Sequence, residues 1–161
     1  MKTLVIIDAQ PFYVDFQRKN GDNEYINNIV DNIVKKVIEF KNNRWPIVCV
    51  EFDPDVNGET IYDISKELNN YYLSFWARKE QRDGSNDIYK LINNLGLPKD
   101  LFVCGLYSNQ CVRDTVVGFL KMSSDIKITI LNNCVYPRHN YETDERVQKV
   151  AENYSQSVSI A

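Results

Sequence analysis

Short, unbroken apolar runs recur along the chain, and each one predicts a strand. The first run covers residues 3–8 and ends at the carboxylate of Asp8. Runs without polar alternation are typical of parallel strands that are covered on both faces. The predicted strands cover residues 3–8, 46–51, 73–79, 100–105, 126–132 and 157–161.

Apolar positions at helical spacing separate these predicted strands. In residues 23–41, isoleucines and valines recur every three or four positions and form one apolar stripe. Ser85 and Gly96 suit the two ends of a second helix, because serine favours the start of a helix and glycine its end. Further helices are predicted over residues 109–122 and 142–153, with a short one near 62–68 in the polar segment 53–73.

Strands and helices alternate from one end of the chain to the other. This alternation predicts the α/β class: a three-layer, Rossmann-like fold with a mostly parallel, open sheet flanked by helices. No internal repeat, low-complexity tract or linker interrupts the pattern. We therefore expect residues 1–161 to form a single domain.

Composition narrows the range of partners. Hydrophobic residues make up 43% of the 161 positions, charged residues 25%, and the net charge is −3. This balance gives no basic field that would attract nucleic acid or an anionic membrane. No apolar run approaches the roughly 18 residues of a membrane-spanning helix, and the N-terminal run is too short for a signal peptide. We expect a cytoplasmic protein that acts on a small molecule.

The four cysteines do not form a disulfide or metal-binding pattern. The sequence contains neither a CxxC motif nor a Cys/His cluster, so reduced thiols are expected. Cys49 and Cys104 fall inside predicted strands and Cys134 follows one, which favours a role as small core residues. Cys111 differs, because it lies where a predicted strand gives way to a helix.

Three chemically useful side chains follow three of the predicted strands. Asp8 follows the first, Lys79 ends the third with Arg78 beside it, and Cys111 comes after the fourth. Open parallel sheets bind ligands beyond the carboxyl ends of their strands, so the three side chains are expected to meet there. Because side chains alternate along a strand, only one of Arg78 and Lys79 should face that crevice.

An acid, an ammonium and a thiol form a chemically coherent group. A helix N-terminus and a nearby ammonium both favour the thiolate of a cysteine, whose ordinary pKa is about 8.5. A carboxylate can take the thiol proton and return it to a leaving amine. Each residue also has a structural explanation: an aspartate at a strand end, a surface lysine and a small core cysteine. For Lys79→Ala, we expect at least about a hundredfold loss of rate and intact folding.

The local contexts of these residues resemble the isochorismatase-like cysteine hydrolase superfamily. Its pattern is D-x-Q after the first strand, a lysine near mid-chain, and G-x-x-[ST]-x-x-C-V-x-x-T at a later strand-to-helix turn. Here these read "VIIDAQ" with Asp8 and Gln10, "ARKEQRDGS" with Lys79, and "GLYSNQCVRDT" with Cys111. The resemblance spans essentially the whole chain in the order of its elements.

The resemblance implies a role for each matching residue. Cys111 would be the nucleophile, Asp8 the general acid and base, and Lys79 its partner. A cis peptide at Leu106–Tyr107 is implied, with the N–H groups of Tyr107 and Cys111 as the oxyanion hole. The family also implies a homo-oligomer, a dimer or tetramer. Side chains near the motifs are expected to bind a small planar substrate. They are Gln10, Phe12, Phe16 and Trp76, with Phe75 beside them. For the aromatic residues, contacts in the core or between subunits are the alternative.

The usual metal ligands of related nicotinamidases are missing. Those enzymes carry an aspartate and two histidines after the second strand, where this chain reads "EFDPDVNGETIYD" with Asp53 and Asp55 but no histidine. Imidazole is a frequent ligand for zinc-type ions, whereas carboxylates alone suit harder cations. We expect no catalytic metal and no cofactor, and the single histidine, His139, is interpreted as a surface residue.

The sequence therefore predicts a metal-independent cysteine hydrolase. Its substrate would be a small amide, carbamoyl or ureido compound whose C–N bond is cleaved through a thioester-type intermediate. The alternative is a catalytically silent relative that acts as a binding or regulatory protein. A nucleotide-binding Rossmann domain is disfavoured, because "DAQPFY" after the first strand has no glycine-rich turn.

Overall fold

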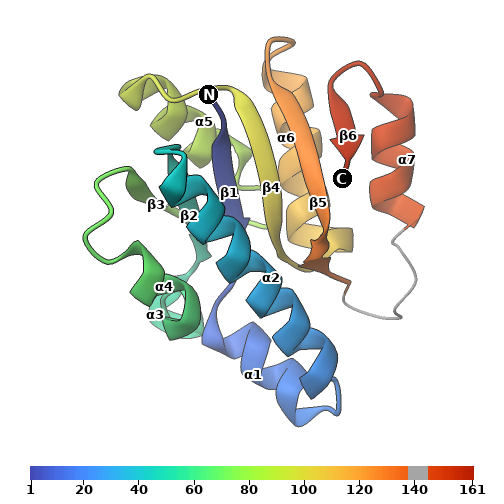
Figure 1. The fold of residues 1–161 in the computed structure, drawn as a ribbon. Coiled ribbons are helices and arrows are strands. Elements are labelled where there is room, and N and C mark those ends of the chain that lie inside the picture. The colour runs from blue at the N-terminus through green and yellow to red at the C-terminus, as the bar shows by residue number, and fades with distance from the viewer. Residues whose placement is uncertain (138–144) are drawn as a thin grey trace.

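The computed structural model describes residues 1–137 and 145–161, which fold around one six-stranded sheet (Figure 1). The strand order is β3-β2-β1-β4-β5-β6, and every neighbouring pair is parallel. The strands are β1 (Thr3–Ile7), β2 (Ile47–Phe52), β3 (Ser74–Lys79), β4 (Asp100–Leu106), β5 (Lys127–Tyr136) and β6 (Val158–Ile160).

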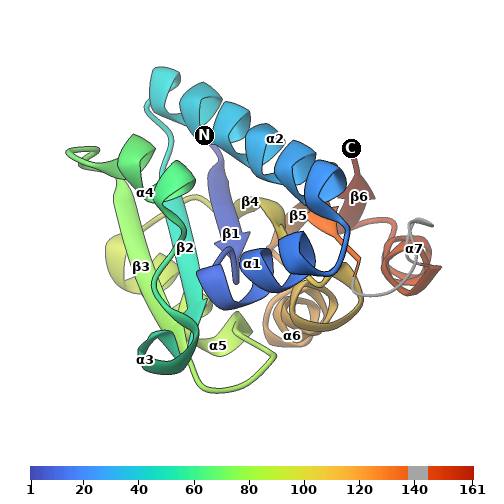
Figure 2. The same cartoon turned by 90° about the horizontal axis from the view of Figure 1, so that it is seen from below.

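Helices cover both faces of the sheet, so the expected three-layer α/β fold is confirmed (Figure 2). The helices are α1 (Pro11–Lys19), α2 (Asn23–Asn42), α3 (Pro54–Asn57), α4 (Tyr62–Leu68), α5 (Ser85–Leu95), the short π-helix η1 (Ser108–Val112), α6 (Arg113–Met122) and α7 (Glu145–Asn153). Within the described part of the chain, no helix is long and apolar enough to cross a membrane.

The central strand β1 supplies side chains to both cores. Leu4 and Ile6 join the apolar cluster under α2 and α4, while Val5 and Ile7 join the cluster under α5 and α6. All five residues of β1 are buried, as expected for a strand covered on both faces. The unbroken apolar run that predicted this strand therefore reflects two separate cores.

The structure corrects three element assignments. Residues 11–19 form α1, which the sequence reading did not predict; Figure 2 shows this helix across the end of β1. Cys134 lies inside β5, which continues to Tyr136 instead of ending at residue 132. The helix predicted over 109–122 begins as a π-helix before it becomes α6. The start of the last predicted helix, residues 142–144, lies outside the described residues.

Strand β4 approaches β1 so closely that one position requires glycine. Gly105 has φ +132, and a Cβ placed there would lie 2.0 Å from the backbone oxygen of Ile7. Glycine alone combines this conformation with the absence of a side chain. The close approach lies just before the turn that carries Cys111, so it contributes to the shape of that turn.

We expect Gly105→Ala to prevent folding, because the clash is with backbone that cannot move aside. The matched control is Gly96→Ala at the end of α5, where φ is +62 but no atom lies within 4 Å of the added Cβ. The control should cost only about 1 to 2 kcal/mol of unfolding free energy, the usual penalty for a left-handed residue. Urea unfolding followed by circular dichroism measures both, and equal losses would contradict the packing argument.

Candidate active site

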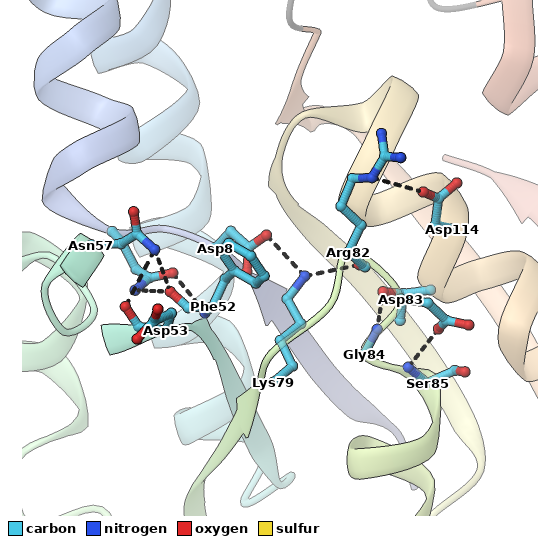
Figure 3. Close-up of polar contacts among 12 residues, drawn as sticks. Asp8, Phe52, Asp53, Asn57, Lys79, Arg82, Asp83, Gly84, Ser85 and Asp114 are labelled. Carbon is cyan, nitrogen blue, oxygen red and sulfur yellow. Dashed lines mark hydrogen bonds and ion pairs between the residues drawn. The ribbon is translucent and has the colours of Figure 1, made fainter. Parts of the chain in front are cut away.

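A buried ion pair lies at the carboxyl edge of the sheet. Asp8 follows β1, Lys79 ends β3, and Lys79 Nζ lies 2.9 Å from Asp8 Oδ2 with both side chains fully buried (Figure 3). The neighbouring Arg78 is exposed. The alternation along β3 therefore places Lys79, and not Arg78, against Asp8.

The loop after β3 shapes the space around the lysine. A Cβ on Gly84 would lie 2.9 Å from Lys79 Cδ, so the aliphatic chain of the lysine uses the room that glycine leaves. Lys79 Nζ donates a hydrogen bond to the Arg82 carbonyl at 3.0 Å (Figure 3). The loop itself is anchored to α6, because the Gly84 N–H donates to Thr115 Oγ1 at 3.1 Å. These contacts hold the ammonium beside the carboxylate.

The thiol of Cys111 interacts with the same carboxylate. Burial raises the pKa of Asp8 above its ordinary value, although Lys79 and Cys111 both act to lower it. Burial and the Asp8 charge raise the pKa of the Cys111 thiol to about 12, against the opposing effect of Lys79. Burial therefore opposes the effect by which the ammonium was expected to favour the thiolate. At neutral pH the Cys111 thiol is therefore protonated, and it lies beside the carboxyl group of Asp8.

Asp8 retains capacity to accept a proton. Within the described residues, neither of its carboxylate oxygens has a hydrogen bond of regular geometry, although the ammonium of Lys79 is close. A buried carboxylate normally satisfies its oxygens with donors. Lys79 and Cys111 are the groups that interact with this carboxylate in the described part of the chain.

The backbone is in the left-handed region at three places along this edge. Asp8, Asp53 and Tyr107 have φ values of +54, +39 and +60, and they follow β1, β2 and β4. Such conformations are uncommon for residues other than glycine, and they gather at functional sites. The peptide bond at Leu106–Tyr107 is trans, so the cis bond implied by the resemblance is not found. The oxyanion hole at Tyr107 and Cys111 stays a prediction.

Cys111 opens onto a cavity of about 810 Å³. Phe12 and Phe16, both expected in the substrate pocket, line it from α1, and Phe52 lines it from the end of β2. Cys111 is only 5% exposed, and Arg82 lies among the lining residues. The cavity therefore gives a small molecule access to an otherwise buried sulfur.

Two residues expected in the pocket lie elsewhere. Gln10 is fully buried, and its amide donates to the carbonyls of Phe52 and Gly58 and accepts from the Phe52 N–H. It joins the ends of β1 and β2 and does not line the cavity. Trp76 is 45% exposed on the edge strand β3. Three positions before Lys79, it points to the opposite face, so nearness in sequence was misleading.

Several cavity residues were missed by the sequence reading. Tyr13 and Gln17 line the cavity from α1, and Tyr136 lines it from the end of β5. The α1 residues could have been found, because positions 12, 16 and 20, like 13 and 17, are spaced for one face of a helix. Tyr136 had no such signal, because its place depends on the unexpected length of β5.

The family model for the isochorismatase domain matches residues 2–160. The chain belongs to the isochorismatase domain family. Members of this family are hydrolases, typically with a cysteine nucleophile, so the expectation of a hydrolase is confirmed at the level of the family. A comparison with curated proteins gave no match.

Solved structures of this fold cover nearly the whole chain. A nicotinamidase from Staphylococcus aureus is 16% identical with a TM-score of 0.77, covering 99% of this chain and 96% of its own. An N-carbamoylsarcosine amidase from Thermoplasma acidophilum is 16% identical with a TM-score of 0.72, covering 99% and 94%. A pyrazinamidase from Pyrococcus horikoshii, solved in complex with zinc, is 17% identical with a TM-score of 0.72, covering 99% and 98%. At these identities the likeness establishes the fold.

The donor set of this isochorismatase-family chain does not fit a zinc-type ion. Asp53 follows β2 in a left-handed conformation, and Asp55 lies in the next helix α3. No group of three His, Cys, Asp or Glu side chains gathers anywhere in residues 1–137 and 145–161. Two carboxylates without imidazole suit a harder cation at best. The absence of a catalytic metal stays a prediction, and His139 lies outside the described residues.

Replacing either charged partner of the Cys111 thiol by a neutral residue should shift the thiol pKa, in opposite directions for the two partners. Asp8→Asn removes the charge that raises the Cys111 pKa, so alkylation by iodoacetamide at pH 8 should become faster even as turnover is lost. Lys79→Met removes the charge that lowers this pKa, so alkylation should become slower. Peptide mass spectrometry over a pH series distinguishes Cys111 from the three fully buried thiols. Asp15→Asn on the exposed face of α1 is the control, and a slower reaction in Asp8→Asn would contradict the assignment.

Proposed function

We propose that the protein hydrolyses the C–N bond of a small amide, carbamoyl or ureido compound through a thioester on Cys111. The observation that carries the proposal is the buried Asp8–Lys79 pair beside a thiol that opens onto a cavity. Structural neighbours named as a nicotinamidase and an N-carbamoylsarcosine amidase support amide chemistry. Asp8, Lys79 and Cys111 are the proposed catalytic residues.

In the first half-reaction the thiol and the carboxylate act together. Cys111 Sγ attacks the carbonyl carbon while its proton passes to Asp8, so no free thiolate accumulates. The C–N bond then breaks, and protonated Asp8 gives its proton to the departing nitrogen. The products of this step are an amine or ammonia and a thioester on Cys111.

In the second half-reaction water replaces the amine. Asp8, again a carboxylate, takes a proton from water as the oxygen attacks the thioester carbon. The C–S bond breaks, and the proton held by Asp8 returns to sulfur. Lys79 stabilises Asp8 whenever the latter is ionised, which makes it a positioning partner of the acid–base group.

The backbone before the nucleophile would stabilise the developing oxyanion. We place this site at the N–H groups of Tyr107, just before η1, and of Cys111, within η1. Groups fixed before the reaction stabilise charge without reorganisation, and one such donor is commonly worth about 10²–10³ in rate. The left-handed conformation of Tyr107 turns the chain at this point, which supports a role for this peptide.

Localisation, metal and cofactor need, and oligomeric state are also matters of proposal. We propose a cytoplasmic enzyme that needs no metal or cofactor and forms a dimer or tetramer. Tyr72 and Trp76 are exposed at the edge strand β3 and its approach, where a second subunit could pack. The cavity volume lies within the range of about 300–1,000 Å³ typical of small-molecule sites.

A substrate screen tests the proposal. Wild-type protein is incubated with a panel of small amides, carbamoyl compounds and ureides, and released ammonia or amine is measured. We expect turnover of at least one class, its loss in Cys111→Ala, and an unchanged rate in the matched variant Cys134→Ala, whose thiol is buried in the other core. Activity should be the same with and without EDTA.

The outcomes separate the proposal from its alternatives. Intact-mass detection of an acyl group on Cys111 during turnover would support the thioester. Hydrolysis that survives Cys111→Ala, or that EDTA abolishes and zinc restores, would overturn the mechanism. Binding of compounds from the panel without any turnover would instead favour a catalytically silent binding protein.

A further inference from the structure

The cavity reaches well beyond the thiol. Asp22 and Tyr25, in the connection between α1 and α2 and the first turn of α2, line it together with Tyr136 at the end of β5. The pKa of Cys111 responds to Asp8, Lys79 and Asp114, whereas the pKa of Tyr136 responds to Asp22, Tyr107 and Tyr25. The two groups of residues therefore define two ends of one cavity.

A chain of polar side chains connects these ends. Gln17 Nε2 donates to the Tyr107 hydroxyl at 3.2 Å, and Gln17 Oε1 lies 3.1 Å from the Tyr136 hydroxyl. The Tyr136 hydroxyl in turn donates to Asp22 Oδ2. Gln17 and Tyr136 are both buried, so this arrangement is held by packing as well as by hydrogen bonds. It fixes the carboxylate of Asp22 at the end away from the sulfur.

The two ends differ in their charge balance. At the thiol end each cation has an acidic partner: Lys79 pairs with Asp8, and Arg82, among the lining residues, lies with its Nε 3.9 Å from Asp114 Oδ2. At the other end Asp22 faces the cavity, and no ion pair with Asp22 is found in residues 1–137 and 145–161. An adjoining hollow of about 320 Å³ is lined by Asp22 and Glu24. The distal end is therefore acidic.

Aromatic rings adjoin this carboxylate. The Tyr25 and Tyr136 ring centroids lie 5.5 Å apart. Burial and the Asp22 charge raise the pKa values of both phenols, so the rings stay neutral and electron-rich at physiological pH. Aromatic faces beside a carboxylate attract ammonium and guanidinium groups through their quadrupoles and through charge. A neutral or anionic group would gain neither interaction.

We propose that the substrate carries a positive charge at the end distal to its scissile bond, bound by Asp22 against Tyr25 and Tyr136. This inference rests on the proposed function, because it assigns the substrate class of the same site. The substrate is an amide, carbamoyl or ureido derivative of an ammonium or guanidinium compound. Asp22 is a specificity-determining residue that touches the substrate and takes no part in the proton transfers at Cys111.

Binding to an inactive variant tests the charge preference without catalysis. Calorimetry on Cys111→Ala compares choline with its neutral carbon isostere, in which a tert-butyl group replaces trimethylammonium. We expect choline to bind about tenfold more tightly, as a cation at an aromatic and partly buried site should. Adding Asp22→Asn should remove the preference, while adding Asp31→Asn, an exposed aspartate on α2 outside the cavity, should leave it.

Kinetics provide the second arm. Two amides that the enzyme hydrolyses are compared, one ending in trimethylammonium and the other in tert-butyl. The wild type should have the lower KM for the cationic amide, and Asp22→Asn should raise the KM for that amide about tenfold with little change in kcat. Asparagine can still accept from Tyr136, so folding is expected to survive. Equal binding of choline and its isostere, or a preference for a terminal carboxylate, would overturn this inference. If choline binds more tightly than its isostere but no amide is hydrolysed, the cation-binding site is supported and the proposed function is overturned.

Discussion

The burial of two opposite charges at one point of the sheet edge constrains everything around the candidate site. Asp8 and Lys79 are 2.9 Å apart and both are inaccessible to solvent. Removing an ion from water costs several kcal/mol even after a protein relaxes around it, and close pairing offsets that cost only when the geometry is good. The pairing requires β1 and β3, which lie on either side of β2, to present their ends toward one another. Gly84, the Arg82 carbonyl and Thr115 are parts of the structure that serve this requirement.

The same burial determines the protonation state in which the site rests. A lysine beside a cysteine is usually taken to promote the thiolate, yet here burial and the Asp8 charge raise the thiol pKa to about 12. The proposed chemistry therefore begins with a neutral thiol and an ionised carboxylate that accepts its proton during attack. Lys79 favours this ionised form by lowering the pKa of Asp8, against the burial that raises it. In the proposed mechanism the sulfur loses its proton only as the substrate carbon approaches.

Hydrophobic periodicity was sufficient to predict most of the fold. Local apolar patterns predicted the individual elements: unbroken runs predicted β1 to β4, and a stripe at helical spacing predicted α2. The alternation of strands and helices then predicted the layers. The strand ends identified Asp8, Lys79 and Cys111, because all parallel strands end at one edge of the sheet. Helix α1 was missed, although its aromatic positions are spaced for a helical face. Its start at Pro11 follows Gln10, which the sequence reading assigned to substrate.

What the sequence reading misjudged depends on contacts between distant segments. Gln10 is held by the backbone of Phe52 and Gly58, more than forty positions away. Lys79 was expected to be replaceable without loss of core volume, yet it is among the largest fully buried side chains. Asp22 lines the cavity, and its carboxylate accepts a hydrogen bond from Tyr136, which lies 114 positions away in the sequence. None of these facts has a local signature in composition or spacing.

A double-mutant cycle on the buried pair tests the account most directly. The free energy of unfolding is measured in urea for Asp8→Asn, Lys79→Met and the double variant. Asp8→Asn leaves the Lys79 ammonium buried without an opposite charge, and Lys79→Met leaves the Asp8 carboxylate in the same position. Each single variant should therefore lose about 3 to 5 kcal/mol of unfolding free energy, while the double variant should be more stable than either. Losses that simply add, or single variants as stable as the wild type, would show that the two charges are not coupled and would contradict the account.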